Sequence, residues 1–357
     1  MSQPAGPSTL GECLAAAAAD RPAAEALVYG EQRLSWGDYA LRVAALARGL
    51  LALGLRPAER IAIYLPNCPD YLLAFLAAAR IGAITLALNP QYTPREVVHL
   101  LGQTGPRLLL TSAELYTPAL ATALARCCSG LQVILAGAGA RGRPGLANVI
   151  AAGDALPKHA LARRGAAVRP EDGAFIVATG GINGRIKGAL LTHANILAAV
   201  QAQVSHLDFG ADDRLLLHLP LNHVSGALIL GAASILSGAA AVIQPQFRPQ
   251  EALALIARER ITLLGQVPTM YSLELAVPDF GRYDLSSLRM CIVAGAPTPA
   301  ALMARLHTLA PRTVHGYGLS EAAGFATFSL AEDDLPTLSA TAGRPLPGVE
   351  LRTLDPD

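Results

Sequence analysis

One glycine-rich segment near the middle of the chain carries the residue types needed to bind phosphate. It spans residues 175–193 and reads FIVATGGINGRIKGALLTH. Its glycines let the backbone turn tightly and point N–H groups at phosphate oxygens, and Lys187 adds a mobile positive charge. Only Lys158 and Lys187 among the 28 basic residues are lysines, so a lysine here is well suited to a chemical role. We therefore expect a phosphate-binding loop built from Thr179, Gly180, Gly181, Gly184 and Lys187.

The pattern around this segment predicts an apolar strand, a glycine-rich turn and then a helix beginning near Thr192. A helix N-terminus would add free N–H donors and a favourable dipole, with Thr192 as its cap. The segment is not a Walker A motif, because Ile186 precedes Lys187, and it contains no G-x-G-x-x-G fingerprint. An ordinary glycine-rich turn with a surface lysine stays open as the alternative.

The bulk composition excludes several classes of protein. The chain has 357 residues, of which 52% are hydrophobic and 15% charged, with a formal net charge of +1. This length predicts two or three packed units, and the composition predicts a globular protein without extensive disorder. No run of like charges marks a nucleic-acid surface. Five scattered cysteines and the lack of a signal-peptide pattern favour a reduced, cytoplasmic protein.

One uncharged segment, Val224 to Ile243, is long enough to span a bilayer. Ala, Gly and Ser dominate it, and Gly238 divides it into a helix-like part and a β-like part. A buried helix followed by a buried strand is the better interpretation. We expect no membrane span.

The order of the elements predicts an α/β protein, because short β-like runs alternate with helical patterns. We expect strands at residues 60–64, 83–88, 107–111, 131–135, 214–219, 240–244, 261–266, 288–294 and 312–316. We expect helices at residues 71–80, 94–101 and 249–258, and another ending at residue 236. A loop-rich stretch at residues 137–170 is the best boundary. The prediction is two similar βαβ-layered subdomains with largely parallel sheets, at residues 1–165 and 166–333, and the start of a small β subdomain at residues 334–357.

Ligands of open α/β sheets bind beyond the carboxyl ends of the strands. The glycine-rich segment follows one expected strand, Gly295-Ala296-Pro297 follows a second, and Gly316-Tyr317-Gly318 follows a third. Three strand-end turns are therefore expected to face one crevice.

Four motifs in a fixed order make the chain resemble the adenylate-forming superfamily of acyl-CoA synthetases, aryl-CoA ligases, luciferases and peptide-synthetase adenylation domains. Residues 219–226 (LPLNHVSG) resemble the family's Leu-Pro-x-x-His stretch, and residues 295–297 (GAP) its adenine-wall turn. Residues 315–321 (HGYGLSE) resemble its Tyr-Gly-x-Thr-Glu motif, and residues 343–348 (GRPLPG) its Gly-x-Pro segment. Four ordered matches are far more specific than any one of them.

The resemblance implies a role for each matching residue. Tyr317 would stack on adenine, Ser320 would reach the α-phosphate, and Glu321 would hold Mg²⁺. Lys187 would neutralise the leaving pyrophosphate. The implied catalytic residues are Lys187, Ser320 and Glu321. The implied nucleotide site adds Gly295, Ala296, Pro297, Gly316, Tyr317 and Gly318 to the loop, and the implied acyl pocket comprises His223, Val224 and Gly226.

Simpler interpretations of three of these residues stay open. Tyr317 could pack between a strand and a helix, and Glu321 could be a charge at a helix N-terminus. His223 could be a core histidine in an apolar stretch.

The activity that the resemblance implies is an ATP- and Mg²⁺-dependent acid–thiol ligase. A small carboxylic acid would form an acyl-adenylate and then a CoA thioester, in a chain compatible with a homodimer. Two alternatives stay open: a non-catalytic nucleotide- and acyl-binding relative, and an adenylation domain that activates an amino or aryl acid. The apolar surroundings of Val224 suit a fatty or aromatic acid best, but the sequence does not identify which acid.

The chain departs from the family in its loop and in its length. The family loop typically reads Thr-Ser-Gly-Thr-Thr-Gly-x-Pro-Lys-Gly, whereas Gly180, Ile182 and Asn183 replace three hydroxyl residues here and Ile186 replaces proline. Hydrogen bonds to a charged group contribute about 1.5–3 kcal/mol each, so we expect weakened ATP handling. The family's ribose-binding aspartate and mobile C-terminal domain with its catalytic lysine would lie beyond Asp357. We expect this chain alone to adenylate poorly and to form no thioester.

Overall fold

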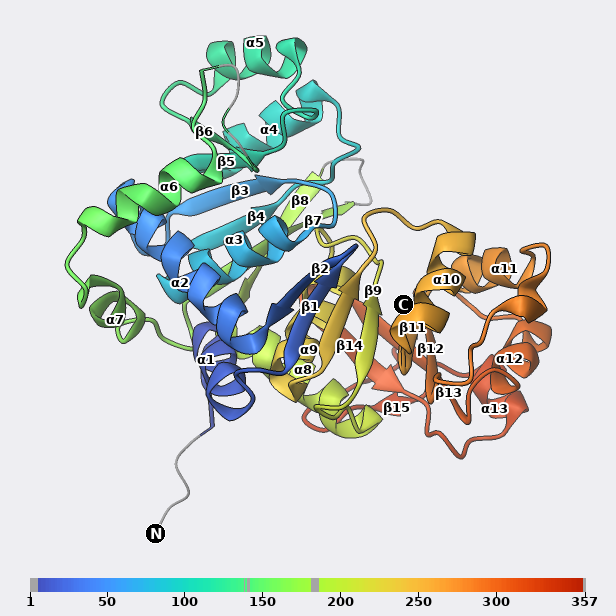
Figure 1. Ribbon diagram of the computed structural model, residues 1–357. Helices are drawn as coiled ribbons and strands as arrows, with labels where there is room; N and C mark the ends of the chain where they lie inside the picture. The colour runs from blue at the N-terminus through green and yellow to red at the C-terminus, as the bar shows by residue number, and fades with distance from the viewer. Residues whose placement is uncertain (1–5, 138, 140–141, 181–185, 356–357) are drawn as a thin grey trace.

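The structure of the protein is a computed structural model that describes residues 6–137, 139, 142–180 and 186–355. Strands in the described ranges form two sheets (Figure 1). The first has the order β6-β5-β3-β4-β7-β8. Its strands are β3 (Arg60–Tyr64), β4 (Ile84–Ala87), β5 (Leu108–Thr111), β6 (Gln132–Leu135), β7 (Gly173–Gly180) and β8 (Ile186–Thr192).

The second sheet is larger and has the order β15-β14-β13-β12-β11-β9-β10-β1-β2. Its strands are β1 (Glu25–Tyr29), β2 (Gln32–Ser35), β9 (Arg214–Leu217), β10 (Ala240–Ile243), β11 (Leu263–Gln266), β12 (Met290–Ala294), β13 (Arg312–Leu319), β14 (Gly324–Phe328) and β15 (Arg344–Pro345). Its central pairs, from β10 to β13, are parallel, and antiparallel pairs close both ends. The predicted α/β class with two largely parallel sheets is confirmed.

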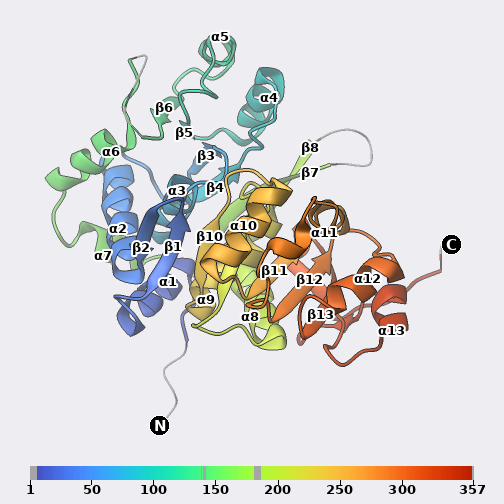
Figure 2. The ribbon, with the colours of Figure 1, turned by 45° about the vertical axis from the view of Figure 1, so that its right-hand side comes forward.

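The helices begin at the signals that the sequence carries. Helix α4, for example, has Thr93 as N-cap, a capping box with Glu96, and proline in its first turn. The α-helices are α1 (Leu10–Asp20), α2 (Trp36–Ala52), α3 (Pro69–Arg80), α4 (Pro94–Thr104), α5 (Pro118–Cys127), α6 (Leu146–Ala152), α7 (Ala160–Gly165), α8 (His193–Leu207), α9 (Ala233–Ser237), α10 (Pro249–Glu259), α11 (Pro268–Leu275), α12 (Ala300–His307) and α13 (Leu335–Ala340). Figures 1 and 2 show α4 and α5 beside β5 and β6, and α10 to α13 beside the β11–β13 end of the second sheet.

Helix α3 joins the two sheets into one core. Its side chains are buried without a break from Tyr71 to Ala79, which indicates a helix enclosed on all sides. Phe75 on this helix meets Phe175 of β7 with ring centroids 5.2 Å apart. The largest buried cluster accordingly contains residues of both sheets.

The sheets combine segments from distant parts of the chain. Strands β1 and β2 join the second sheet, through the parallel pair β1–β10, and β7 and β8 join the first sheet. Both arrangements cross the expected boundary near residue 165. The division into subdomains at residues 165 and 333 stays a prediction.

The phosphate segment differs from its expected local structure. Strands β7 and β8 pair antiparallel, with Thr179 opposite Lys187 and Gly180 opposite Ile186. Lys187 therefore lies on a strand, and the prediction that it lies in the glycine-rich turn was wrong. The cause is that the backbone from residue 186 to 192 pairs with β7 before any helix begins. Helix α8 does begin after Thr192, whose side chain accepts from the Asn195 N–H at 3.1 Å, so the cap is confirmed.

Two further segments test the sequence predictions. Gly316, Tyr317 and Gly318 lie within β13, paired with β14, and not in a turn after the strand as expected. Residues 224–243 form a π-helix (Ser225–Ala232), α9 and β10, which confirms a buried helix followed by a buried strand. Across the described ranges, every helix is too short or too polar to cross a membrane.

Candidate functional site

A cavity of about 800 Å³ lies where the second sheet meets the first. Strands β11, β12 and β13, the end of β7 and the π-helix all contribute to its wall. Much of the wall is apolar, with Ile229, Leu230, Met270, Ile292 and Phe325 contributing side chains. Seven residues predicted for the site line it: Thr179, His223, Val224, Gly295, Gly318, Ser320 and Glu321.

A second cavity of about 420 Å³ adjoins the first, because Gly295 and Gly318 line both. Ala296, Pro297, Gly316 and Tyr317 complete the predicted set on its wall. The residues missed by sequence reasoning are His315, Ser339, Ala340, Thr341 and Ala342.

The register of the parallel strands explains why residues 295–297 and residues 316–318 line the same cavity. Ala294 of β12 lies opposite Gly316 of β13, so the turn that starts at Gly295 is placed beside Tyr317. The pairing of β13 with β14 shifts register between Tyr317 and Gly318, and such bulges often re-aim a side chain near a site. Tyr317 is 49% exposed, so its aromatic face is open to a ligand.

His223 and Ser320 connect two motifs that are far apart in sequence. The His223 Nε2 atom lies 3.4 Å from Ser320 Oγ, and the Ser225 N–H donates to His223 Nδ1 at 3.2 Å. Because Nδ1 accepts, the neutral ring carries its proton on Nε2 and can donate toward Ser320. Partial loss of hydration beside the cavity lowers the pKa of His223 below its ordinary value, which favours this neutral form.

The charged residues expected to handle phosphate occupy different places. Glu321 lies in a 3₁₀ turn at the end of β13 and lines the larger cavity. Lys187 is exposed on β8, opposite Thr179, and does not line either cavity. Within the described part of the chain, neither charge forms an ion pair. Gly180 pairs with Ile186 where β7 meets β8, and Gly181 and Gly184 lie outside the described residues.

Gly226 packs against the backbone of Leu219 and Pro220, two residues that line the larger cavity. Among the described residues it is not one that lines the cavity, although its motif neighbours do. It lies in the first turn of the π-helix, where an added Cβ would stand 2.3 Å from the Pro220 carbonyl oxygen. The lack of a side chain therefore lets the 219–224 segment pack onto the helix.

The side chains at the cavity wall could hold Mg²⁺ only together with the phosphates of a bound nucleotide. No group of three or more His, Cys, Asp or Glu side chains able to hold a metal occurs among the described residues. Glu321 offers one carboxylate at the cavity wall. Mg²⁺ usually binds through one or two carboxylates, waters and substrate phosphates, so this single ligand is compatible with Mg²⁺ bound to ATP.

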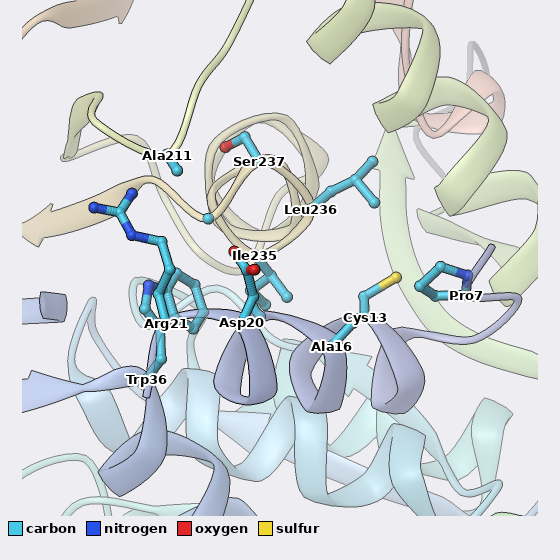
Figure 3. Close-up of a pocket in the computed structure, with 12 residues that line it drawn as sticks. Pro7, Cys13, Ala16, Asp20, Arg21, Trp36, Ala211, Ile235, Leu236 and Ser237 are labelled. Atoms are coloured by element: carbon cyan, nitrogen blue, oxygen red, sulfur yellow. The ribbon is translucent and has the colours of Figure 1, made fainter. Parts of the chain in front are cut away.

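A third, smaller cavity of about 290 Å³ lies between α1 and the end of α9 (Figure 3). Cys13, Trp36, Leu236 and Ser237 are on its wall. None of the predicted site residues lines it, so it is separate from the site described above.

Some cavity residues could be found from the sequence and others could not. Gln266 ends an expected strand, and the strand-end rule that selected Gly295 applies to it equally. Ile229 and Leu230 line the cavity from a π-helix, which has no simple sequence signature. Ser339 to Ala342 line the second cavity, of about 420 Å³, and only tertiary packing brings them there.

Comparison with known proteins gives a family match over almost the whole chain. The model of the family "AMP-binding enzyme" matches residues 14–357. An acyl-CoA ligase (sidI) of Aspergillus fumigatus is 34% identical over 97% of this chain and 61% of its own length. A feruloyl-CoA synthase of an Amycolatopsis species is 33% identical over 85% of this chain and 57% of its own length. The chain thus spans about three fifths of the length of these relatives.

Solved structures of related proteins have a similar fold. An inhibitor-bound N-terminal domain of FACL13 from Mycobacterium tuberculosis superposes with a TM-score of 0.80 at 27% identity, covering 95% of this chain and 82% of that one. An anthranilate CoA ligase, AuaEII, in complex with anthranoyl-AMP gives a TM-score of 0.88 at 22% identity over 98% of this chain and 66% of its own, which shows a common fold.

Proposed function

The chain belongs to the AMP-binding enzyme family, and from that premise we propose that it is the nucleotide- and acyl-binding portion of an ATP-dependent acyl-CoA synthetase. The observation that carries the proposal is the pair of adjoining cavities with Gly295 and Gly318 in both walls. One cavity has a wall of mostly small residues, rich in glycine and alanine, and an exposed tyrosine ring, which together suit a flat adenine ring. The other has the size and apolar wall that suit an acyl group.

The proposed reaction begins at the junction of the cavities. A carboxylate oxygen of the acid attacks the α-phosphorus of ATP, the bond to the β-phosphate oxygen breaks, and pyrophosphate leaves. Ser320 and the Nε2–H of His223, 3.4 Å apart, supply donors for the α-phosphate. Lys187 would counter the charge of the pyrophosphate, which requires a change in its present exposed position. Catalysis would rest on positioning and charge neutralisation.

Glu321 is the residue that would hold Mg²⁺, which when bound with ATP neutralises phosphate charge. The thiol of CoA would then attack the acyl carbon and release AMP. In this proposal the whole protein is a cytoplasmic enzyme of fatty or aromatic acid metabolism. We also propose that the protein forms a homodimer and that its subdomains divide at residues 165 and 333.

A non-catalytic relative is the second candidate. The replacement of a family hydroxyl by Gly180, and the position of Lys187 outside both cavity walls, favour it. The free carboxylate of Glu321 at the cavity wall opposes it. Exchange of radiolabelled pyrophosphate into ATP, driven by a carboxylic acid, would separate the two candidates.

Binding of MgATP tests the assigned nucleotide site. We expect Tyr317→Ala to weaken binding about tenfold or more, because it removes the stacking face, whereas Tyr317→Phe keeps that face and should bind like the parent. Lys187→Met should also weaken MgATP binding but leave AMP binding unchanged, since AMP lacks the β- and γ-phosphates. Titration calorimetry gives all these dissociation constants. Equal MgATP affinity in the parent and in Tyr317→Ala would show that adenine does not stack on Tyr317.

A further inference from the structure

Among the polar side chains on the wall of the larger cavity, that of Gln266 is the most deeply buried. Gln266, the last residue of β11, lines the cavity and is 3% exposed. Its Nε2 donates to Oε1 of Glu274 at 2.6 Å, and Glu274, on α11, is also 3% exposed. These two residues form a buried amide–carboxyl pair, and neither has a place in the reaction proposed above.

The pair has an unused acceptor. Oε1 of Gln266 is buried and has no hydrogen-bond partner within the described ranges. A buried polar atom without a partner is costly, and it usually signals a missing water or ligand. An acceptor calls for a donor, which in an acyl group means a hydroxyl or an N–H.

The charge state of the pair restricts that donor further. Burial raises the pKa of Glu274 to about 8, although the hydrogen bond from Gln266 acts in the opposite direction. The carboxyl group is therefore mainly neutral near pH 7. An ammonium or a second carboxylate would bring an uncompensated charge into this apolar wall, whereas a hydroxyl brings none.

The strand order of the second sheet places Gln266 at a distance from Ser320, where the acyl carboxylate would react. Gln266 lies opposite Val293 of β12, which in turn lies opposite His315 of β13. Two strand spacings therefore separate Gln266 from β13, roughly 10 Å. Ser320 follows β13, and Met270 and Ile292 line the same cavity. An acyl group anchored at Ser320 would pass apolar side chains before it reaches Gln266.

We propose that Gln266, positioned by Glu274, selects carboxylic acids whose apolar chain carries a hydroxyl group remote from the carboxylate. This inference rests on the proposed function, and it narrows the substrate class of the same site. Gln266 would contact the substrate hydroxyl, and Glu274 would act as a positioning residue that holds the amide.

The test uses pairs of non-hydrolysable acyl-adenylate analogues, the acyl sulfamates of adenosine, in a series of chain lengths. Within each pair one chain ends in a hydroxyl group and the other in a methyl group. At the chain length that fits, calorimetry on the parent should show the hydroxyl analogue bound about tenfold more tightly. Gln266→Met, which keeps the length of the side chain, should abolish this preference.

Two more variants separate the proposed roles from a general loss of structure. Glu274→Gln keeps a neutral acceptor for the Gln266 amide and should retain the preference. Leu273→Ala changes a side chain on the same helix that is 49% exposed, and should also retain it. Melting temperatures show whether each variant is folded.

Equal binding of the paired analogues to the parent at every length would overturn the inference, as would a preference that persists in Gln266→Met. If both analogues bind equally and compete with ATP, the proposed function still stands. If no analogue binds at any length, both the inference and the proposed function are wrong.

Discussion

Replacing Gly318 by alanine is expected to destabilise the protein by about 3 kcal/mol and to abolish adenylate binding. An added Cβ would stand 2.1 Å from the Gly324 carbonyl oxygen, closer than real Cβ contacts allow. The obstacle is backbone of the adjacent strand β14, so β13 and β14 must move apart. Overpacking a tight contact costs typically 1–3 kcal/mol, and a clash with backbone belongs at the upper end. Because Gly318 lines both cavities, the same movement would disturb the site.

Gly281→Ala is the matched control. Gly281 lies in a short 3₁₀ turn, where an added Cβ would meet no atom within 4 Å. Urea unfolding of the two variants and the parent measures the difference in free energy of unfolding. A Gly318→Ala protein as stable as Gly281→Ala would show that β13 and β14 are not packed as described.

Acidification is expected to remove stability through buried neutral histidines. His218 is 3% exposed, and burial lowers its pKa to about 4. The unfolded chain takes up this proton near pH 6.5, whereas the folded chain takes it up only near pH 4. The stabilisation is therefore complete above pH 6.5 and falls as the pH drops toward 4, by about 3 kcal/mol for one group. His193, which is fully buried with its pKa lowered to about 4, should act in the same direction.

A variant that lacks only His218 isolates the effect of this one group. His218→Leu cannot take up the proton, and its repacking cost does not depend on pH. The difference in unfolding free energy between His218→Leu and the parent should therefore shift in favour of the variant by about 3 kcal/mol from pH 7 to pH 4. Urea titrations at half-unit steps of pH measure it. A difference that stays constant with pH would mean that His218 titrates normally in the folded protein.

The local parts of the fold were predictable because local sequence determines them. The short β-like runs predict β3 and β10 to within one residue at each end, and Thr192 is predicted as a cap from its type and place. Gly295 and Tyr317 line one cavity, although Tyr317 lies within β13 and not in the strand-end turn that was expected.

The long-range parts were not predictable from such patterns. The joining of β1 to β10 pairs residues more than two hundred positions apart, such as Leu27 with Ala241, and only tertiary packing decides it. The pairing of β7 with β8 was missed because glycines around Lys187 suit either a turn or a strand. The contact between Gln266 and Glu274 depends on how α11 packs beside β11, which periodicity does not encode.

The affinity of one acyl-adenylate analogue relative to AMP tests the central claim most directly. If the two adjoining cavities form one site, a molecule that fills both should bind once per chain and at least about a hundredfold more tightly than AMP, because its acyl and adenosine parts bind together. Calorimetry on the parent chain gives both dissociation constants and the stoichiometry. An analogue that binds no more tightly than AMP would contradict a joint nucleotide and acyl site.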